Sequence, residues 1–166
     1  MAHSDLEVFY RLPASAIGKT DVGRLIREVE SLDQFIVQSA IRQPGQPMKI
    51  PKTSKILDEA ILQNELNMLH ADDRQKLLEF LRSVYETAPT MHMSFSADPS
   101  PFFMKRLMTW VRQEIHPLVL VQVGLQPNIG AGCVVMTKNK YFDLSLRNRF
   151  FERRDLLIQK LRGPKT

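Results

Sequence analysis

Three adjacent residues, Gly18, Lys19 and Thr20, match the end of a phosphate-binding loop at the point where its helix begins. Such a loop also needs a glycine at its start, where the backbone curls around the phosphates. Pro13 stands at that position and has no amide hydrogen to donate. No apolar strand precedes it either. The sequence therefore favours an ordinary helix start over a nucleotide site.

A second glycine group, Gly130 and Gly132, is reminiscent of a dinucleotide-binding turn. The third glycine of that motif would fall at Val135, and the segment leads into an apolar strand where the motif requires a helix. A diphosphate would then have no helix N-terminus to sit on. The pattern favours glycines that allow close backbone approach beside a turn.

The cysteine, histidine and serine residues form no pattern that predicts a nucleophilic or metal site. Cys133 is the single cysteine, so an internal disulfide and a cysteine-based metal cluster are excluded. The four histidines offer Cys133 no base at a recognisable spacing, and no serine lies in a nucleophile elbow. We expect Cys133 to be a buried strand residue. The sequence predicts no enzyme, no catalytic residue, no cofactor, no metal and no small-molecule substrate.

Positive charge is concentrated at the C-terminal end. The net charge is +5, and residues 138–166 hold nine Lys or Arg against three acids. Arginines next to Phe150 and Phe151 could grip single-stranded nucleic acid by stacking and phosphate contact. On a helix, however, the apolar residues of this segment share one face, which predicts an amphipathic helix docked on a small sheet with a solvated basic side. Acidic protein and nucleic acid both remain possible partners.

Helices must dominate the first half. Apolar residues at spacings of three and four predict helices over residues 20–42, 53–70 and 72–88. We expect Thr20 to cap the first, Thr53 or Ser54 the second, and Asp72 the third. The Pro-rich stretch 43–51 is typical of a linker. Residues 1–88 thus form a helical segment.

Strands and helices are mixed in residues 89–166, which we predict to be a small α/β domain, so that the whole chain is α+β. Strands are predicted at 91–96, 118–125 (as a central strand), 133–136 and 141–142. Between the first two, Pro101 opens a helix with Phe103, Leu107, Trp110 and Val111 along it. Residues 138–140 should form a tight hairpin. Asp143 or Ser145 should cap the terminal basic helix.

The overall composition is that of a globular chain. Its 166 residues are 43% hydrophobic and 25% charged, enough for one compact core. No apolar run approaches the length of a membrane span, and the N-terminus has no basic region followed by an apolar core. We expect a cytoplasmic protein.

The ordered motifs of the second half resemble a known family. Residues 93–161 resemble the C-terminal region of the delta subunit of F-type ATP synthases, the oligomycin-sensitivity-conferring protein of mitochondria. The resemblance rests on Ser96, Ala97, Asp98 and Pro99 before a helix; on Pro127, Ile129, Gly130 and Gly132 before Val134 and Val135; and on Asp143, Ser145 and Arg147. The E-type stator protein of V-type and A-type ATPases has a comparable terminal pattern. Residues 1–88 are outside the resemblance.

The resemblance implies a non-catalytic subunit of the peripheral stalk, or stator, in a proton-translocating complex that makes ATP. Its partners would be the b subunit of the stalk and the alpha subunits of the catalytic head, and it would be held at the membrane only through the complex. We expect partner contacts at Arg147, Phe151, Arg154 and Arg162, and on the exposed side of the first helix. Gly130, Gly132, Asp143 and Ser145 would be structural. The alternative is a small basic nucleic-acid-binding module.

Overall fold

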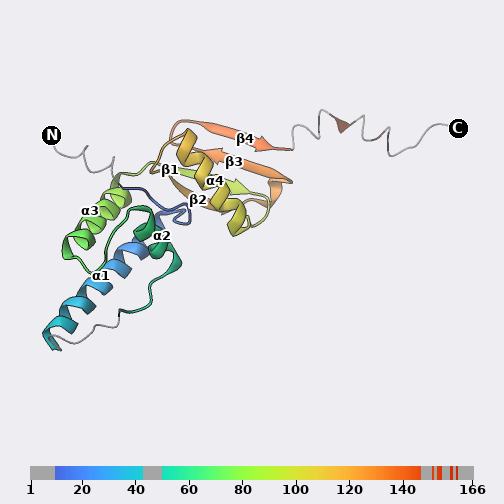
Figure 1. Ribbon diagram of the computed structural model, residues 1–166. Coiled ribbons are helices and arrows are strands. Elements are labelled where there is room, and N and C mark those ends of the chain that lie inside the picture. Colours follow the sequence, from blue (N-terminus) through green and yellow to red (C-terminus); the bar gives the residue numbers. More distant parts are fainter. Residues whose placement is uncertain are drawn as a thin grey trace. The chain divides into compact units, whose positions relative to one another are not determined.

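The computed structural model describes residues 10–42, 50–146, 151, 153, 154, 158 and 160. The chain has an α+β fold, with helices followed by a four-stranded sheet (Figure 1). Its elements are α1 (Lys19–Arg42), α2 (Lys55–Gln63), α3 (Ala71–Thr87), β1 (Thr90–Phe95), α4 (Pro101–Glu114), β2 (Leu120–Leu125), the single-turn helix η1 (Pro127–Ile129), β3 (Gly132–Met136) and β4 (Tyr141–Ser145). None of the helices within the described ranges is long and apolar enough to cross a membrane.

Two compact units interleave along the chain. The helical unit contains α1, α2, α3, α4 and the residues that lead to Leu120, whereas the sheet unit contains β1, the rest of β2, η1, β3 and β4. The sequence predicts a single boundary after residue 88, but α4 groups with the N-terminal helices.

The core of the helical unit lies between α1 and α3, which run side by side (Figure 1). The predicted stripe of α1 is buried at Val22, Leu25, Val29, Leu32 and Ile36. Helix α3 adds Leu77, Leu78, Leu81 and Val84, and the chain beyond α4 adds Leu118 and Leu120. Burial of these side chains stabilises the unit by about 1.5–3 kcal/mol for each large apolar residue.

The start of α1 differs from its prediction. The helix begins at Lys19, so Thr20 lies inside it and is not the cap. The carbonyl of Gly18 accepts the amides of Asp21 and Val22, and the Asp21 carboxylate accepts the amides of Ile17 and Gly18 at 3.0 and 3.1 Å. The Asp21 carboxylate therefore binds the amides of the two residues that precede the helix.

Helix α2 begins as predicted and ends early. The Ser54 hydroxyl accepts the Leu57 amide at 3.2 Å, which confirms it as a cap. The helix stops at Gln63 and not at residue 70, because the Asn64 amide group donates to the carbonyl of Ala60 at 2.8 Å and Glu65 takes a φ of 51°.

The cap of α3 is also corrected. His70 occupies the cap position without a side-chain hydrogen bond, and Asp72 lies within the first turn. Its neighbour Asp73 turns back to accept the Asn67 amide at 2.9 Å, which fixes the loop before the helix. The predicted stop before Pro89 is confirmed.

The strand order of the sheet is β2-β1-β3-β4. β1 and β4 are both antiparallel to β3, with Ser94 opposite Val134 and Val134 opposite Asp143. The alternation predicted for β1 is confirmed, since Met91, Met93 and Phe95 are buried. β2 lies at an edge and not at the centre of the sheet: burial in the run 118–125 ends at Val121.

Helix α4 begins at Pro101, as predicted, and buries one of its faces. Met104, Met108 and Val111 are buried, whereas Phe103 and Trp110 are exposed. Apolar residues occupy two rows of this helix, so its sequence period does not select one face.

Candidate partner-binding surfaces

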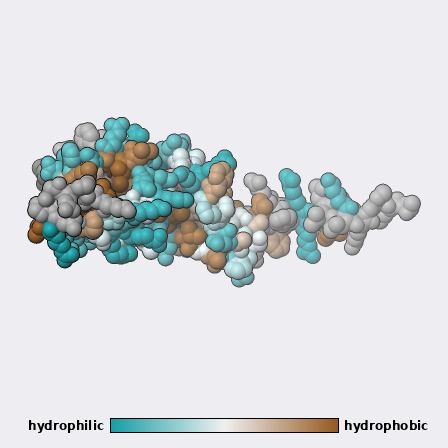
Figure 2. All heavy atoms as spheres, turned by 60° about the horizontal axis from the view of Figure 1, so that its bottom comes forward, coloured by the Kyte–Doolittle hydropathy of each residue, from teal (hydrophilic) through white to brown (hydrophobic). Residues whose placement is uncertain are grey.

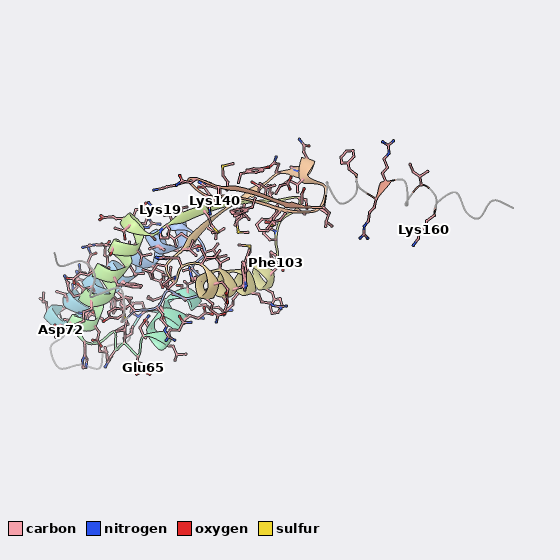
Figure 3. The ribbon with its side chains drawn as sticks, turned by 90° about the horizontal axis from the view of Figure 1, so that it is seen from above. Lys19, Glu65, Asp72, Phe103, Lys140 and Lys160 are labelled. Carbon is pink, nitrogen blue, oxygen red and sulfur yellow. The ribbon has the colours of Figure 1, made fainter. Side chains whose placement is uncertain are left out.

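Helix α4 exposes a row of aromatic side chains. Phe102, Phe103 and Trp110 have exposed fractions of 72%, 47% and 55%, and together with Arg106 and Leu107 they line a shallow depression. We call these five residues the α4 aromatic surface. The Arg106 guanidinium lies 5.8 Å from the centre of the Phe102 ring. Figure 3 labels Phe103 at the N-terminal end of the helix. Large aromatic groups gathered in an exposed cluster are typical of interaction sites.

Contacts within the helical unit fix the position of α4. From the helix, Arg112 donates to the carbonyls of Leu12, Pro13 and Ala16 at 3.0, 2.6 and 2.5 Å. Burial lowers the pKa of Arg112 to about 10, so the guanidinium is charged at neutral pH and its charge is solvated by main-chain oxygens. These bonds attach the segment before α1 to α4.

A second attachment joins α4 to α2. The Lys105 ammonium donates to Glu59 at 2.8 Å, and the Ser15 hydroxyl donates to the other oxygen of the same carboxylate at 2.6 Å. The Lys105 hydrogen bond, followed by that of Ser15, lowers the pKa of Glu59 below 4.5. Lys105 and Arg112 are therefore used within the unit, and Arg106 is the cation that the α4 aromatic surface presents to the outside.

Four of the motif residues, Gly130, Gly132, Asp143 and Ser145, lie on the β3–β4 hairpin or just before it. Gly132 has a φ of 95°, and a Cβ atom there would lie 2.6 Å from the Leu144 carbonyl oxygen and 2.9 Å from Ser145 Cα. Gly130 also has a positive φ, 76°, but open space around it. Asp143 and Ser145 are not helix caps: both lie in β4, where the Asp143 carboxylate accepts the Ser145 amide at 2.9 Å. Gly132 and Ser145 pair at the end of the hairpin that is far from its turn.

The predicted partner residues of the C-terminal end are only partly described. Arg147 and Arg162 lie outside the described residues, as does most of the predicted terminal helix. Phe151 is 63% exposed and Arg154 is exposed. Figure 2 shows one face of the molecule, on which hydrophobic groups lie among hydrophilic ones.

No family model and no curated protein matches this chain.

In the group of Gly18, Lys19 and Thr20, the first amide is already bonded within the chain. The amide of Gly18 donates to Asp21, and the Lys19 ammonium lies 5.0 Å from the centre of the Tyr85 ring. A carboxylate of the protein itself thus accepts the Gly18 amide. This geometry agrees with the prediction of an ordinary helix start.

Cys133 is partly buried in β3, and burial raises the pKa of its thiol. A raised pKa lowers the thiolate population and opposes a nucleophilic role. Within the described part of the chain, His, Cys, Asp and Glu side chains form no group of three that could hold a metal ion.

Sequence reasoning missed the α4 aromatic surface. It placed Phe103, Leu107 and Trp110 along α4 as one apolar run, without noticing that Met104 and Met108 form a second row on the same helix. The signal was the number of apolar residues: two rows exceed what one buried face needs.

Proposed function

We propose that this chain is a non-catalytic subunit of the peripheral stalk of a rotary ATP synthase, a connector between the catalytic head and the membrane sector. The observation that carries the proposal is the ordered series of motifs at residues 96–99, 129–132 and 143–147, which resembles the C-terminal region of delta subunits. A connector resists torque through broad surfaces and needs no reactive group.

The surroundings of these motifs are compatible with that role. Pro99 and Ser100 lead into α4, and Gly130 and Gly132 form the turn into β3, so two of the motifs stand where elements begin. The exposed aromatic groups of α4 and the basic C-terminal end offer contact surfaces. An acidic stalk helix would suit the basic end, since opposite charges steer two proteins together.

The test is affinity purification of the tagged full chain from membranes of the organism that makes it, solubilised in mild detergent and washed at moderate salt. The proposal expects alpha and b subunits of an ATP synthase to be recovered together in stoichiometric amounts. A Gly132→Val variant should lose them, because it distorts the hairpin, whereas Gly130→Ala should keep them. An intact synthase isolated from the same membranes without this chain would refute the proposal.

The nucleic-acid alternative makes a different prediction. A basic module that contacts several phosphates binds an oligothymidylate with an affinity that falls steeply between about 50 and 200 mM salt. The stator proposal expects no such binding by the full chain. Steep, salt-dependent binding together with failure to recover synthase subunits would favour the alternative.

A further inference from the structure

The outer edge of β2 carries an inference that is separate from the stator proposal, since none of the motifs behind that proposal lies in this strand. Within the described ranges, β2 has one neighbour in the sheet, β1, and no strand pairs with its other side. Val123 and Leu125 are 39% and 60% exposed, and Gln122 and Gln126 are exposed as well. An edge strand of this kind is a template for pairing with another strand.

Backbone hydrogen bonds show which residues of β2 turn toward its outer edge. The Leu120 amide donates to the carbonyl of Pro89 at 2.9 Å. The Gln126 amide donates to the carbonyl of Phe95 at 2.8 Å. The spacing between the two bonds is the same on both segments, so β1 and β2 run parallel, and the even-numbered residues of β2 bond to β1. Because the two sides of a strand alternate, the odd-numbered residues turn their N–H and C=O groups outward.

Charged residues do not block this edge. Residues 117–137 contain no Asp, Glu, Lys or Arg. Proteins usually protect a free edge with charged side chains, a proline or a bulge. The strand at the opposite edge of the sheet, β4, follows that rule, with Asp143 in its middle and Lys140 directly before it. Two copies of β2, by contrast, can meet without repulsion between like charges.

The sequence of this edge is complementary to itself. If two β2 strands pair antiparallel about a two-fold axis at Gly124, Val123 lies opposite Leu125 of the second copy, and their outward main-chain groups exchange hydrogen bonds. Both side chains are apolar and lie on one face. On the other face, Gln122 lies opposite Gln126 of the second copy, where two amide groups can bond to each other. Gly124 lies opposite itself, and its lack of a side chain allows close approach.

Neighbouring positions of the axis are less suitable. An axis at Val123 would bring the outward groups of Val121 into the pairing, and Val121 is buried. An axis at Leu125 would place Pro127 opposite Val123, and a proline has no amide hydrogen to donate. Gly124 is therefore the centre at which every outward group of the pair belongs to an exposed residue.

We infer that β2 pairs with the β2 strand of a second copy of this chain, antiparallel and two-fold about Gly124, so that two sheets join edge to edge. Outward N–H and C=O groups select an extended strand as the occupant, as in other cases of strand addition. The interface is one strand wide, which belongs to the small, transient class. The dimer therefore forms in a concentration-dependent way.

Disulfide cross-linking of the full chain tests the register. Gln122 and Gln126 of the two copies would form a non-hydrogen-bonded pair, with Cα atoms about 4.5 Å apart, which a disulfide can bridge. Each is replaced by Cys in a separate chain that also carries Cys133→Ser, because Cys133 is the single native thiol. Under mild oxidation we expect covalent dimers in a mixture of Gln122→Cys and Gln126→Cys chains. Absence of dimers in the mixture, or equal dimer yields from either variant alone, would overturn the inference.

Sedimentation equilibrium over a concentration series tests the dimer itself. The native chain should pass from monomer to dimer as its concentration rises. Val123→Lys combined with Leu125→Lys should abolish the dimer, because like charges then lie opposite each other. The same two positions changed to Glu should also give a monomer, and a mixture of the Lys and Glu chains should restore the dimer. That restoration shows that the exposed substitutions have not unfolded the strand.

A control at the other edge of the sheet uses Tyr141→Lys with Leu144→Lys, since these β4 side chains are 61% and 60% exposed. This chain should form the dimer as the native chain does. Equal loss of the dimer in this control and in the β2 Lys variant would overturn the inference. So would a native chain that stays monomeric at every concentration, or one that grows beyond a dimer, as pairing of β2 with β4 of the next copy would produce.

Discussion

Arg112 donates from Nη1 to the main-chain oxygen of Pro13 at 2.6 Å, although ninety-nine residues separate the two in the sequence. Its other bonds reach the main-chain oxygens of Leu12, Ala16 and Val119. A single guanidinium thereby joins the segment before α1 to α4.

Replacing Arg112 with Met should destabilise the helical unit. The change keeps the aliphatic volume but removes the donor of the Leu12, Pro13, Ala16 and Val119 carbonyls, which we expect to lower the free energy of unfolding by about 1–3 kcal/mol. Urea unfolding followed by Trp110 fluorescence measures the effect. Arg106→Met, on the exposed side of the same helix, is the control, and the claim fails should both variants unfold at the same urea concentration.

A similar comparison is available between α1 and α3. Arg74 is buried and donates to Asp33 at 2.6 Å, whereas Arg82 and Glu30 meet at the same distance in solvent. We expect Asp33→Asn to cost about 1–3 kcal/mol, because it removes the charged partner of a buried guanidinium. Glu30→Gln should cost less than about 1 kcal/mol. Chemical unfolding of both variants decides the matter, and equal losses would mean that burial of Arg74 has no energetic consequence.

The two glycines of the hairpin should respond differently to alanine. At Gly130 the only obstacle is the positive φ, worth about 1–2 kcal/mol. At Gly132 the same penalty is joined by a clash with the backbone of Leu144 and Ser145, so Gly132→Ala should destabilise the sheet unit more. Amide exchange in β3 and β4 reports this unit directly. Faster exchange in the Gly130 variant than in the Gly132 variant would contradict the assignment.

Acid should weaken the attachment of α4 to α2. The pKa of Glu59 is lower in the folded chain than its ordinary 4.5, chiefly through Lys105 and then Ser15. A lowered carboxyl pKa contributes stability above the unfolded pKa, and this contribution is lost as the pH falls through the folded value. Glu59→Gln should therefore reduce the drop in melting temperature below about pH 4.5. Lys105→Met should have the same effect, and an unchanged acid slope in both would refute the coupling.

Cys133 should be a slow nucleophile. Because burial raises the pKa of its thiol, alkylation by iodoacetamide at neutral pH should be slower in the folded chain than in urea. A rate in the folded chain that equals or exceeds the rate in urea would reopen the question of a reactive cysteine.

The predictions that succeeded rest on the spacing of apolar residues within one element. The stripe of α1 and the alternation of β1 were read from spacing alone, because each element buries one face and its period reveals that face. The predictions failed where the outcome depended on distant partners. Whether the run 118–125 becomes a central or an edge strand depends on which strands pair beside it.

Capping was harder to predict for the same reason. Near α1 and α3, carboxylates turn back to the loop before the helix, as Asp21 and Asp73 do, and a different residue takes the cap position. The α4 aromatic surface escaped prediction because both rows of the helix are apolar, and only the fold determines which row is covered.

The interleaving of the two units has a consequence for synthesis on the ribosome. A growing chain that has released α1, α2 and α3 still lacks Leu118 and Leu120, which belong to the core of the helical unit. Once β1 has also emerged, its partner strand β3 is still missing, and the apolar residues Met91, Met93 and Phe95 lie in an unpaired strand. We expect the nascent chain to present this apolar strand to chaperones until the residues of β3 have left the exit tunnel.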